Sequence, residues 1–243
     1  IVVYLEQCIS FFRTCPMSLS HQLRQEILWI THSDPSTANA LSVDEIRELD
    51  ALITNNAHIS GLVWKGAGDR TFCSGGNLRF YKNQSDQKVN ILANRQIRKT
   101  LNRLSRLEVP TVVLIDGDVF GGGVELISSF DYVISAPHSF FGLWQRRQRL
   151  SYGWGGGTRL RRRLHRGQMS ELALSSRNIS AYEAKRIGLV DELVSPTHQE
   201  ERAQRWIDQG NGFSSDSVGA LKNWSPQKEI SFFERLWLKK YSD

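Results

Sequence analysis

Residues 120–129 read FGGGVELISS and place three consecutive glycines in front of an apolar stretch. A glycine inside a helix costs about 1 kcal/mol relative to alanine. Two explanations are open for Gly121–Gly123: the backbone there needs a positive φ or close packing, or a ligand approaches N–H groups that no side chain shields. The preceding TVVLID (111–116) is typical of a buried strand, and the residues after the glycines are typical of a helix.

The same alternation of short apolar runs and longer helical patterns continues along the chain. Ser42 and Glu45 form a capping box before a helix over 42–55, and Pro110 marks the end of a helical pattern over 86–107. This order predicts an α/β domain closed by a helical C-terminal section from Thr197 onward, with breaks near GNGF (210–213) and Pro226. The other predicted elements are strands at 25–32, 61–66, 132–136 and 189–194, and a helix over 180–188 capped by Ser180 and Glu183 and ended by Gly188.

Composition limits the classes of protein that remain. A chain of 243 residues with 40% hydrophobic and 23% charged residues can bury one large core. The apolar runs, such as 112–115, are too short to span a bilayer, and the start carries no basic leader, so we expect a cytoplasmic protein without membrane contact. Three cysteines without CxxC spacing indicate reduced thiols, and six scattered histidines predict no metal site.

The chain begins at Ile1, whereas Met17 is followed by a plausible natural start, SLSHQ. We therefore interpret residues 1–16 as a pre-segment or a cloning remnant without a catalytic role. The core is expected over 17–195 and the helical C-terminal section over 196–243.

Positive charge is concentrated between Gln145 and Arg166, where eight arginines occur without an acid. Such a segment can bind phosphates of a nucleic acid or of a nucleotide-bearing cofactor. It can also be a solvated helix face, with Leu160 and Leu164 pointing inward. The second interpretation is favoured, because no nucleic-acid-binding module is recognisable, and it places Arg159, Arg162, Arg163 and Arg166 outside.

Two glycine-rich loops have the same position between a strand and a helix. They are GDRTFCSGGNLRF (68–80) and DGDVFGGGVELIS (116–128). Backbone N–H groups at such turns point outward without partners, and two of them can converge on one acceptor oxygen. This would form an oxyanion hole, in which each donor contributes about 3 kcal/mol. Neither loop has the pattern of a nucleotide-hydrolysing P-loop.

With these loops in view, the chain resembles the crotonase (enoyl-CoA hydratase/isomerase) superfamily over roughly residues 27–194, and its tail through ALKNW (220–224) is similar too. Each motif is weak alone, but their order and spacing are specific. The motifs are TFCSGGNL (71–78), GGGVEL (121–126), SFFG (139–142), GWGGGTRL (153–160) and SAYEAKRIGLVDELV (180–194).

The resemblance implies a spiral of ββα units, C-terminal helices that pack in a homotrimer or hexamer, and an acyl-CoA thioester substrate. Coenzyme A would enter as part of the substrate, with no permanently bound cofactor. The oxyanion donors would be the N–H groups of Gly76 and Gly122, and Glu125 would hold and activate water, unless it only stabilises a helix dipole. Further substrate contacts are expected from Ser74, Asn77, Leu78, Gly121 and Trp144.

Several departures from the family pattern bear on the reaction. Gln145 stands where a second carboxylate is usual, and a glutamine amide cannot titrate, so hydration by two carboxylates is in question. Trp144 and Tyr152 stand at usual proline positions, and Asn77 replaces an aspartate. Bulky Phe140, Phe141 and Trp144 either reshape the acyl pocket or fill the core. Arg79, Tyr81 and Lys82 either contact a substrate carboxylate or CoA phosphates, or form the solvated first turns of a helix.

The sequence therefore predicts an acyl-CoA-processing enzyme of the enoyl-CoA hydratase/isomerase type that stabilises a thioester enolate. Its catalytic residues would be Gly76, Gly122, Glu125 and Gln145, with Gln145 hydrogen-bonded to substrate. Decarboxylation of a malonyl-type thioester and thioester hydrolysis are alternatives. A non-catalytic protein that binds acyl-CoA or RNA is the alternative from another class.

Overall fold

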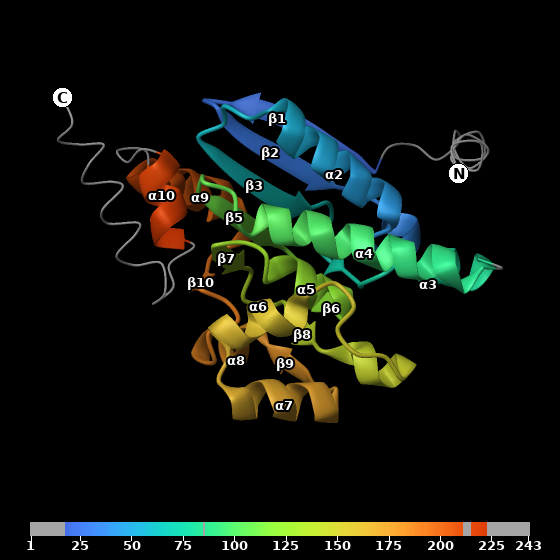
Figure 1. Ribbon diagram of the computed structural model, residues 1–243. Coiled ribbons are helices and arrows are strands. Elements are labelled where there is room, and N and C mark those ends of the chain that lie inside the picture. The colour runs from blue at the N-terminus through green and yellow to red at the C-terminus, as the bar shows by residue number, and fades with distance from the viewer. Residues whose placement is uncertain (1–17, 85, 211–214, 223–243) are drawn as a thin grey trace, which may run out of the picture.

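The structure is a computed structural model that describes residues 18–84, 86–210 and 215–222 (Figure 1). The interpretation of residues 1–16, the break at Pro226 and most of the break at 210–213 lie outside the described residues. So does the end of the ALKNW stretch.

A six-stranded sheet forms the centre of the fold, in the order β1-β2-β3-β5-β7-β10 (Figure 1). Strands β1 and β2 pair antiparallel, and the other pairs are parallel. Parallel strands covered on both faces require apolar runs, and the central strands carry buried ones at 27–30, 62–64 and 112–115. The strands are β1 Leu19–Arg24, β2 Ile27–His32, β3 Gly61–Gly66, β5 Thr111–Ile115, β7 Tyr132–Ser135 and β10 Glu192–Leu193.

A second sheet of four short strands has the order β4-β6-β8-β9. Each of β3, β5 and β7 is followed in the chain by one strand of this second sheet, and then by a helix or a 3-10 turn. The predicted spiral of ββα units is therefore confirmed. The short strands are β4 Thr71–Cys73, β6 Asp118–Phe120, β8 Phe140–Gly142 and β9 Asn178–Ser180.

Helices cover both faces of the large sheet. Helices α2 and α4 pack together on one face, and α9 packs against β5 and β7 on the other (Figure 1). The helices are α2 Val43–Asn55, α3 Leu78–Asn83, α4 Gln87–Leu104, α5 Gly122–Ile127, α6 Gly156–Arg163, α7 Arg166–Ser175, α8 Ala181–Arg186, α9 Pro196–Gly210 and α10 Ser215–Lys222, with 3-10 turns η1 Pro35–Thr37 and η2 Trp144–Gln148.

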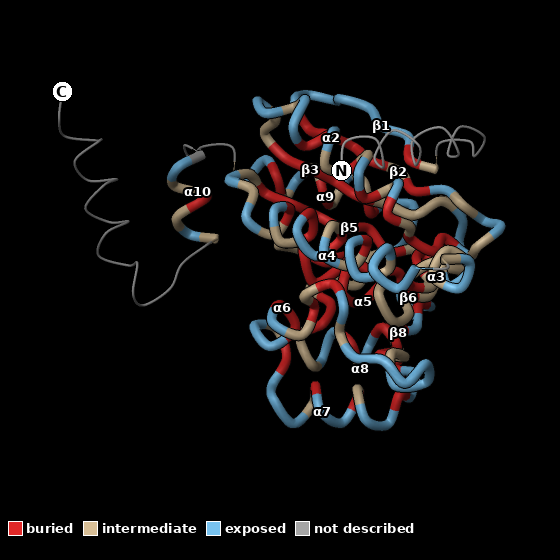
Figure 2. The backbone as a smooth tube through the Cα atoms, turned by 45° about the vertical axis from the view of Figure 1, so that its right-hand side comes forward, coloured by how far each residue is buried: buried red, intermediate tan, exposed pale blue. Residues whose placement is uncertain are grey.

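Alternate strand residues fill two separate cores, as the period-2 geometry of a strand requires. In β2, Leu28 and Ile30 face the larger core, whereas Ile27 and Trp29 join Ile207 of α9 in the smaller one. Buried residues lie through the middle of the molecule, and exposed residues lie mainly on the outer parts of the chain (Figure 2).

Local signals placed the starts of α2 and α8 correctly, whereas α4 ends at Leu104, before the predicted end at 107. The capping box of Ser42 and Glu45 is present at the start of α2. The side chain of Ser180 accepts a hydrogen bond from the N–H of Glu183 at the start of α8, and Gly188 follows its end with a φ of 86°. None of the described helices is long and apolar enough to cross a membrane.

The start of the first predicted strand is wrong. Gln25 and Glu26 have φ values of 49° and 62° and form the turn between β1 and β2, so the strand begins at Ile27. Left-handed backbone at two consecutive residues usually favours glycine or asparagine. Neither is present, and the hairpin with β1 therefore left no turn signal in the sequence.

Candidate active site

The two glycine-rich loops lie against each other, as their matching positions predicted. A Cβ added at Gly75 would lie 3.1 Å from the backbone nitrogen of Gly122. Gly76 forms a parallel bridge with Leu41, whose N–H donates to the carbonyl of Gly75 at 2.8 Å. Within the described residues, neither the N–H of Gly76 nor that of Gly122 donates a hydrogen bond. Two unpaired backbone donors therefore occur on adjoining loops.

Conformation and packing account for the three consecutive glycines. Gly121 has a φ of 53°, which is in the region that favours glycine. A Cβ at Gly122 would lie 2.5 Å from the indole of Trp154, and one at Gly123 would lie 2.6 Å from the carbonyl oxygen of Cys73. The first of the two sequence explanations therefore applies, and the glycines by themselves are no evidence for a ligand.

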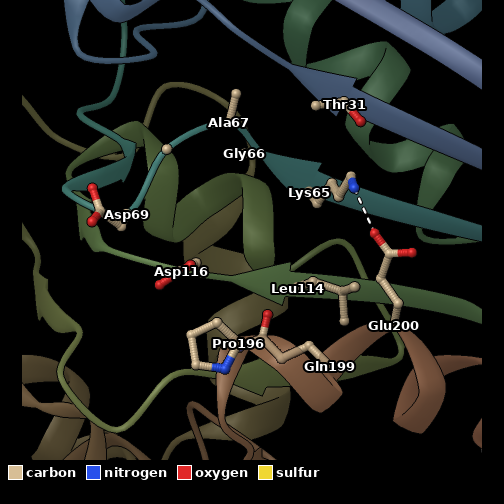
Figure 3. Close-up of a pocket in the computed structure, with 11 residues that line it drawn as sticks. Thr31, Lys65, Gly66, Ala67, Asp69, Leu114, Asp116, Pro196, Gln199 and Glu200 are labelled. Carbon is tan, nitrogen blue, oxygen red and sulfur yellow. Dashed lines mark hydrogen bonds and ion pairs between the residues drawn. The ribbon is translucent and has the colours of Figure 1, made fainter.

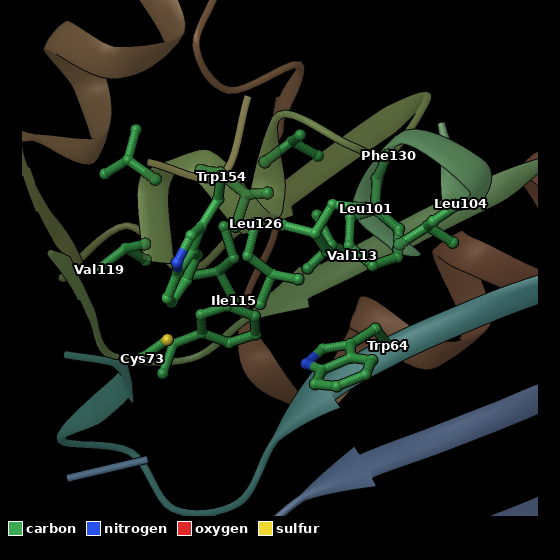
Figure 4. Packing of buried hydrophobic residues seen from close by; sticks show 14 of the residues in the cluster. Trp64, Cys73, Leu101, Leu104, Val113, Ile115, Val119, Leu126, Phe130 and Trp154 are labelled. Carbon is green, nitrogen blue, oxygen red and sulfur yellow. The ribbon is translucent and has the colours of Figure 1, made fainter. Parts of the chain in front are cut away.

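The indole of Trp154 is the central side chain of this region, and the sequence did not single it out. Its benzene ring contacts Gly122 and lies 3.2 Å from where a Cβ of Gly76 would stand. Trp154 is buried and belongs to the same hydrophobic cluster as Cys73 (Figure 4). Its Nε1 donates to Oδ1 of Asn94 on α4 at 3.0 Å. Because these contacts join residues far apart in sequence, no local sequence pattern predicts them.

Glu125 is buried on α5 and binds the loop that precedes α6. Its Oε2 accepts hydrogen bonds from the N–H groups of Trp154 at 2.9 Å and Gly156 at 2.8 Å. Its Oε1 accepts from the N–H of Gly153 at 3.3 Å and from Nε2 of Gln145 at 3.2 Å. Each oxygen thus receives two donors, which together occupy its lone pairs. The carboxylate is an anchor for the glycine-rich loop in this arrangement.

The structure places Gln145 beside Glu125, with Nε2 of Gln145 donating to the carboxylate. Its Oε1 is buried and has no hydrogen-bond partner in the described part of the chain. An unsatisfied amide oxygen costs free energy and is available to a donor on a bound molecule or to water. A substrate contact of Gln145 stays a prediction.

The prediction that Arg159 faces solvent is wrong, because its side chain is 5% exposed. Its Nη2 donates to the carbonyl oxygens of Glu125 at 3.1 Å and Trp154 at 2.9 Å. Burial lowers the pKa of the guanidinium to about 10, and the charge of Glu125 opposes this shift. Helical periodicity predicts which face of a helix is apolar, but it does not predict which arginine will donate hydrogen bonds to carbonyl oxygens of other segments. Further acceptors are Oδ1 of Asn102 and Oγ of Ser128.

Other arginines of the 145–166 segment also bind backbone carbonyls. Arg146 donates to Leu174 and Arg147 to Ser176 at the end of α7. Arg163, which was also predicted to face outward, is partly buried: it donates to Phe130 at 3.2 Å and pairs with Asp191. Half of the eight arginines therefore have structural partners, which weakens the interpretation of a phosphate-binding patch. The exposed remainder is Arg149, Arg161, Arg162 and Arg166.

Trp144 is held in an aromatic stack at the edge of the second glycine-rich loop, on the residue that precedes Gly121. Its ring stacks on Phe120 at 3.7 Å between centroids and 8° between planes, and Arg147 lies over it at 4.2 Å. Its Nε1 donates to Asn178 at 2.9 Å. The packing gives these aromatic residues a structural role, and Phe141 is likewise buried in the core.

The side chains of Ser74 and Asn77 are used locally. Ser74 donates to the carbonyl of Thr37 at 3.1 Å, and Asn77 caps α3 by accepting from the N–H of Arg79 and of Phe80. Leu78 is 42% exposed. Their roles in binding substrate stay predictions.

Tyr81 is partly buried against Gly76 and is not part of a solvated helix turn. Its ring lies 3.3 Å from where a Cβ of Gly76 would stand, and its hydroxyl donates to Oδ1 of Asn94 at 3.1 Å. Burial raises the pKa of this phenol. The side chains of Tyr81 and Trp154 therefore share one acceptor on α4.

A cavity of about 500 Å³ lies elsewhere, where strands β2, β3 and β5 end (Figure 3). Lys65 and Glu200 form an ion pair at its wall, and Asp69 and Asp116 also line it. None of the predicted site residues lines this cavity. In residues 18–84, 86–210 and 215–222, no group of three or more His, Cys, Asp or Glu side chains could hold a metal ion.

Known proteins with similar sequences and structures support the fold. The chain is 32% identical over 174 residues to the short-chain-enoyl-CoA hydratase of Clostridium acetobutylicum, covering 69% of this chain and 65% of that protein. It is 31% identical over 165 residues to the ethylmalonyl-CoA decarboxylase of Rattus norvegicus, covering 67% of this chain and 55% of the relative. The chain thus spans less than two thirds of the length of these curated relatives.

A crystal structure of enoyl-CoA hydratase from Bacillus anthracis matches with a TM-score of 0.82 at 26% identity, covering 91% of this chain and 90% of the other. The family description "Enoyl-CoA hydratase/isomerase" matches residues 22–228. The motifs, the spiral of two sheets and these similarities agree. The chain therefore belongs to the enoyl-CoA hydratase/isomerase family.

Proposed function

We propose that the protein acts on an acyl-CoA thioester and stabilises its enolate with the N–H groups of Gly76 and Gly122. The observation that supports this proposal is that both donors lie on adjoining loops and remain unpaired within the described residues. Preorganised donors of this kind stabilise negative charge as it develops, by about 3 kcal/mol each. The names of the relatives provide the substrate class, acyl-CoA.

Among the reactions that pass through such an enolate, decarboxylation of a malonyl-type thioester fits the site best. Hydration requires one group to accept a proton and another to supply one. Here the two oxygens of Glu125 already receive four N–H donors, and Gln145 cannot titrate. Hydration of an enoyl thioester, with Glu125 holding water, is the second candidate and requires Glu125 to release some of these donors.

Decarboxylation needs no protein base. The bond between the carboxylate carbon and the α-carbon breaks, CO₂ leaves, and the electron pair becomes the enolate whose oxygen binds the two amides. A proton from water then adds to the α-carbon. The only demand on the protein is to hold the thioester oxygen and orient the carboxylate.

The test is mass-spectrometric product analysis with a mixed panel of CoA esters. Conversion of ethylmalonyl-CoA to butyryl-CoA, without hydration of crotonyl-CoA, is expected. Hydration of crotonyl-CoA to 3-hydroxybutyryl-CoA, without decarboxylation, would make Glu125 the water-holding base. Binding of the esters without turnover would favour a non-catalytic acyl-CoA protein, and salt-sensitive RNA binding through the exposed arginines would favour the RNA-binding alternative.

A homotrimer or hexamer is part of the same proposal, as is a cytoplasmic location. Sedimentation analysis of the full chain measures the first, and imaging of the tagged protein in its own cell measures the second. Neither is needed for the reaction argued above.

A further inference from the structure

We propose that Trp154, held by Asn94, is the residue that limits the length of the acyl group at the Gly76 and Gly122 amides. This inference rests on the proposed function and adds a substrate class to it, namely short-chain acyl thioesters. It follows from where the indole lies and from how firmly the surrounding residues hold it.

The indole stands next to both oxyanion donors. Its benzene ring reaches within 2.5 Å of a Cβ added at Gly122 and 3.2 Å of one added at Gly76. A thioester oxygen bound to both N–H groups would lie about 3 Å from each nitrogen. In the proposed binding mode, the carbons attached to that carbonyl lie against the ring, at van der Waals distances of about 3.5–4 Å. A long acyl chain meets the indole before it can extend.

The indole is held from both ends. On the side chain, Nε1 donates to Asn94 at 3.0 Å, and the same oxygen accepts from Tyr81. On the backbone, the N–H of Trp154 donates to Glu125 at 2.9 Å and its carbonyl accepts from Arg159 at 2.9 Å. The side chain is only 4% exposed. Moving the ring aside would break the buried bond to Asn94, and the backbone bonds prevent the whole residue from shifting, so the ring acts as a fixed wall.

Asn94 is the positioning residue of this wall. Its Nδ2 donates to the carbonyl of Asn90 one turn earlier on α4, at 3.1 Å, which orients Oδ1 toward the two aromatic side chains. The ring of Tyr81 also lies near Gly76, 3.3 Å from where its Cβ would stand. The two rings near the amides and the residue that holds them therefore come from three separate segments: α3, α4 and the loop before α6.

The experiment measures binding of saturated, unreactive esters, so it does not depend on which reaction occurs. Acetyl-, butyryl- and octanoyl-CoA are titrated into the wild-type chain, Trp154→Ala and Trp154→Phe by calorimetry. The wild type should bind butyryl-CoA at least tenfold more tightly than octanoyl-CoA. Trp154→Ala should raise the affinity for octanoyl-CoA relative to that for butyryl-CoA at least tenfold. Trp154→Phe keeps a ring at the wall and should retain the wild-type preference.

Circular dichroism and thermal melting establish that each variant is folded. If Trp154→Ala does not fold, Asn94→Ala replaces it, because it frees the indole without removing it, and the same shift toward octanoyl-CoA is expected. The same chain-length ranking in the wild type and the folded variant, with all esters bound, would overturn the inference and leave the proposed function intact. If the wild type binds no ester, the proposed function and this inference both fail.

Discussion

The carboxylate of Glu125 and the backbone N–H of Trp154 are hydrogen-bonded at 2.9 Å, and this contact joins α5 to the loop before α6. Gly153 and Gly156 donate to the same carboxylate. One buried charge thus shapes the loop that carries the indole facing both glycine amides. The acid and the aromatic residue form a single unit, and changes at either one should affect the other.

Glu125→Gln should destabilise the protein by about 3 kcal/mol. The amide oxygen can accept only part of the four hydrogen bonds, its NH₂ group faces N–H donors, and buried donors that lose a charged partner are costly. Urea unfolding measures the change. Glu201→Gln is the control, because Glu201 is exposed at 57% and its ion pair with Arg205 is worth little. A loss of less than about 0.5 kcal/mol in Glu125→Gln would contradict the role of anchor.

Gly122→Ala should cost about 1–3 kcal/mol, because the new methyl group would meet the indole. Combining it with Trp154→Ala removes the clash, so the double variant should be more stable than the sum of the two single effects predicts. A double-mutant cycle by urea unfolding measures this coupling. Purely additive effects would mean that the close contact between these residues is absent.

Arg159→Met should lower the free energy of unfolding by about 3 kcal/mol. The substitution keeps an apolar stem but leaves the carbonyls of Glu125 and Trp154 without their donor. Arg162→Met is the matched control on the same helix, because Arg162 is exposed, and it should change stability by less than about 0.5 kcal/mol. Equal effects of the two substitutions would refute the buried role of Arg159.

His32 should make the protein less stable at mildly acidic pH. The ring is fully buried, neither nitrogen has a hydrogen-bond partner in the described residues, and burial lowers its pKa against the pull of Glu45 and Asp34. As the pH falls through 6.5, the unfolded chain takes up a proton that the folded chain resists, so the free energy of unfolding decreases.

Urea unfolding at pH 7.5 and pH 5.5 measures this dependence on pH. His32→Phe keeps an aromatic ring of similar size and removes the titrating group, so its stability should change less over the same range. An unchanged pH dependence in His32→Phe would assign the effect to other groups.

Much of the fold could be predicted because it depends on near neighbours in sequence. The capping residues Ser42 and Ser180, the apolar strands and the two glycine-rich loops act over a few residues, and periodicity reveals them. The turn at Gln25 and Glu26 was not predicted, because two residues that are neither glycine nor asparagine adopt the left-handed conformation there. Tertiary packing of β1 on β2 outweighs their local preference.

From the sequence alone it was possible to predict most strands of the large sheet, several of the helices that cover it, and the family resemblance. The strand β1 and the four short strands of the second sheet were not predicted. The roles of Trp154, Arg159 and Glu125 became visible only in the folded chain. Trp154 meets Asn94 sixty positions earlier in the chain, and Arg159 meets Asn102 fifty-seven positions earlier. The spiral of the two sheets brings these segments together. Hydrogen bonds between residues so far apart do not produce a periodic pattern in the sequence, so they could not be predicted from it.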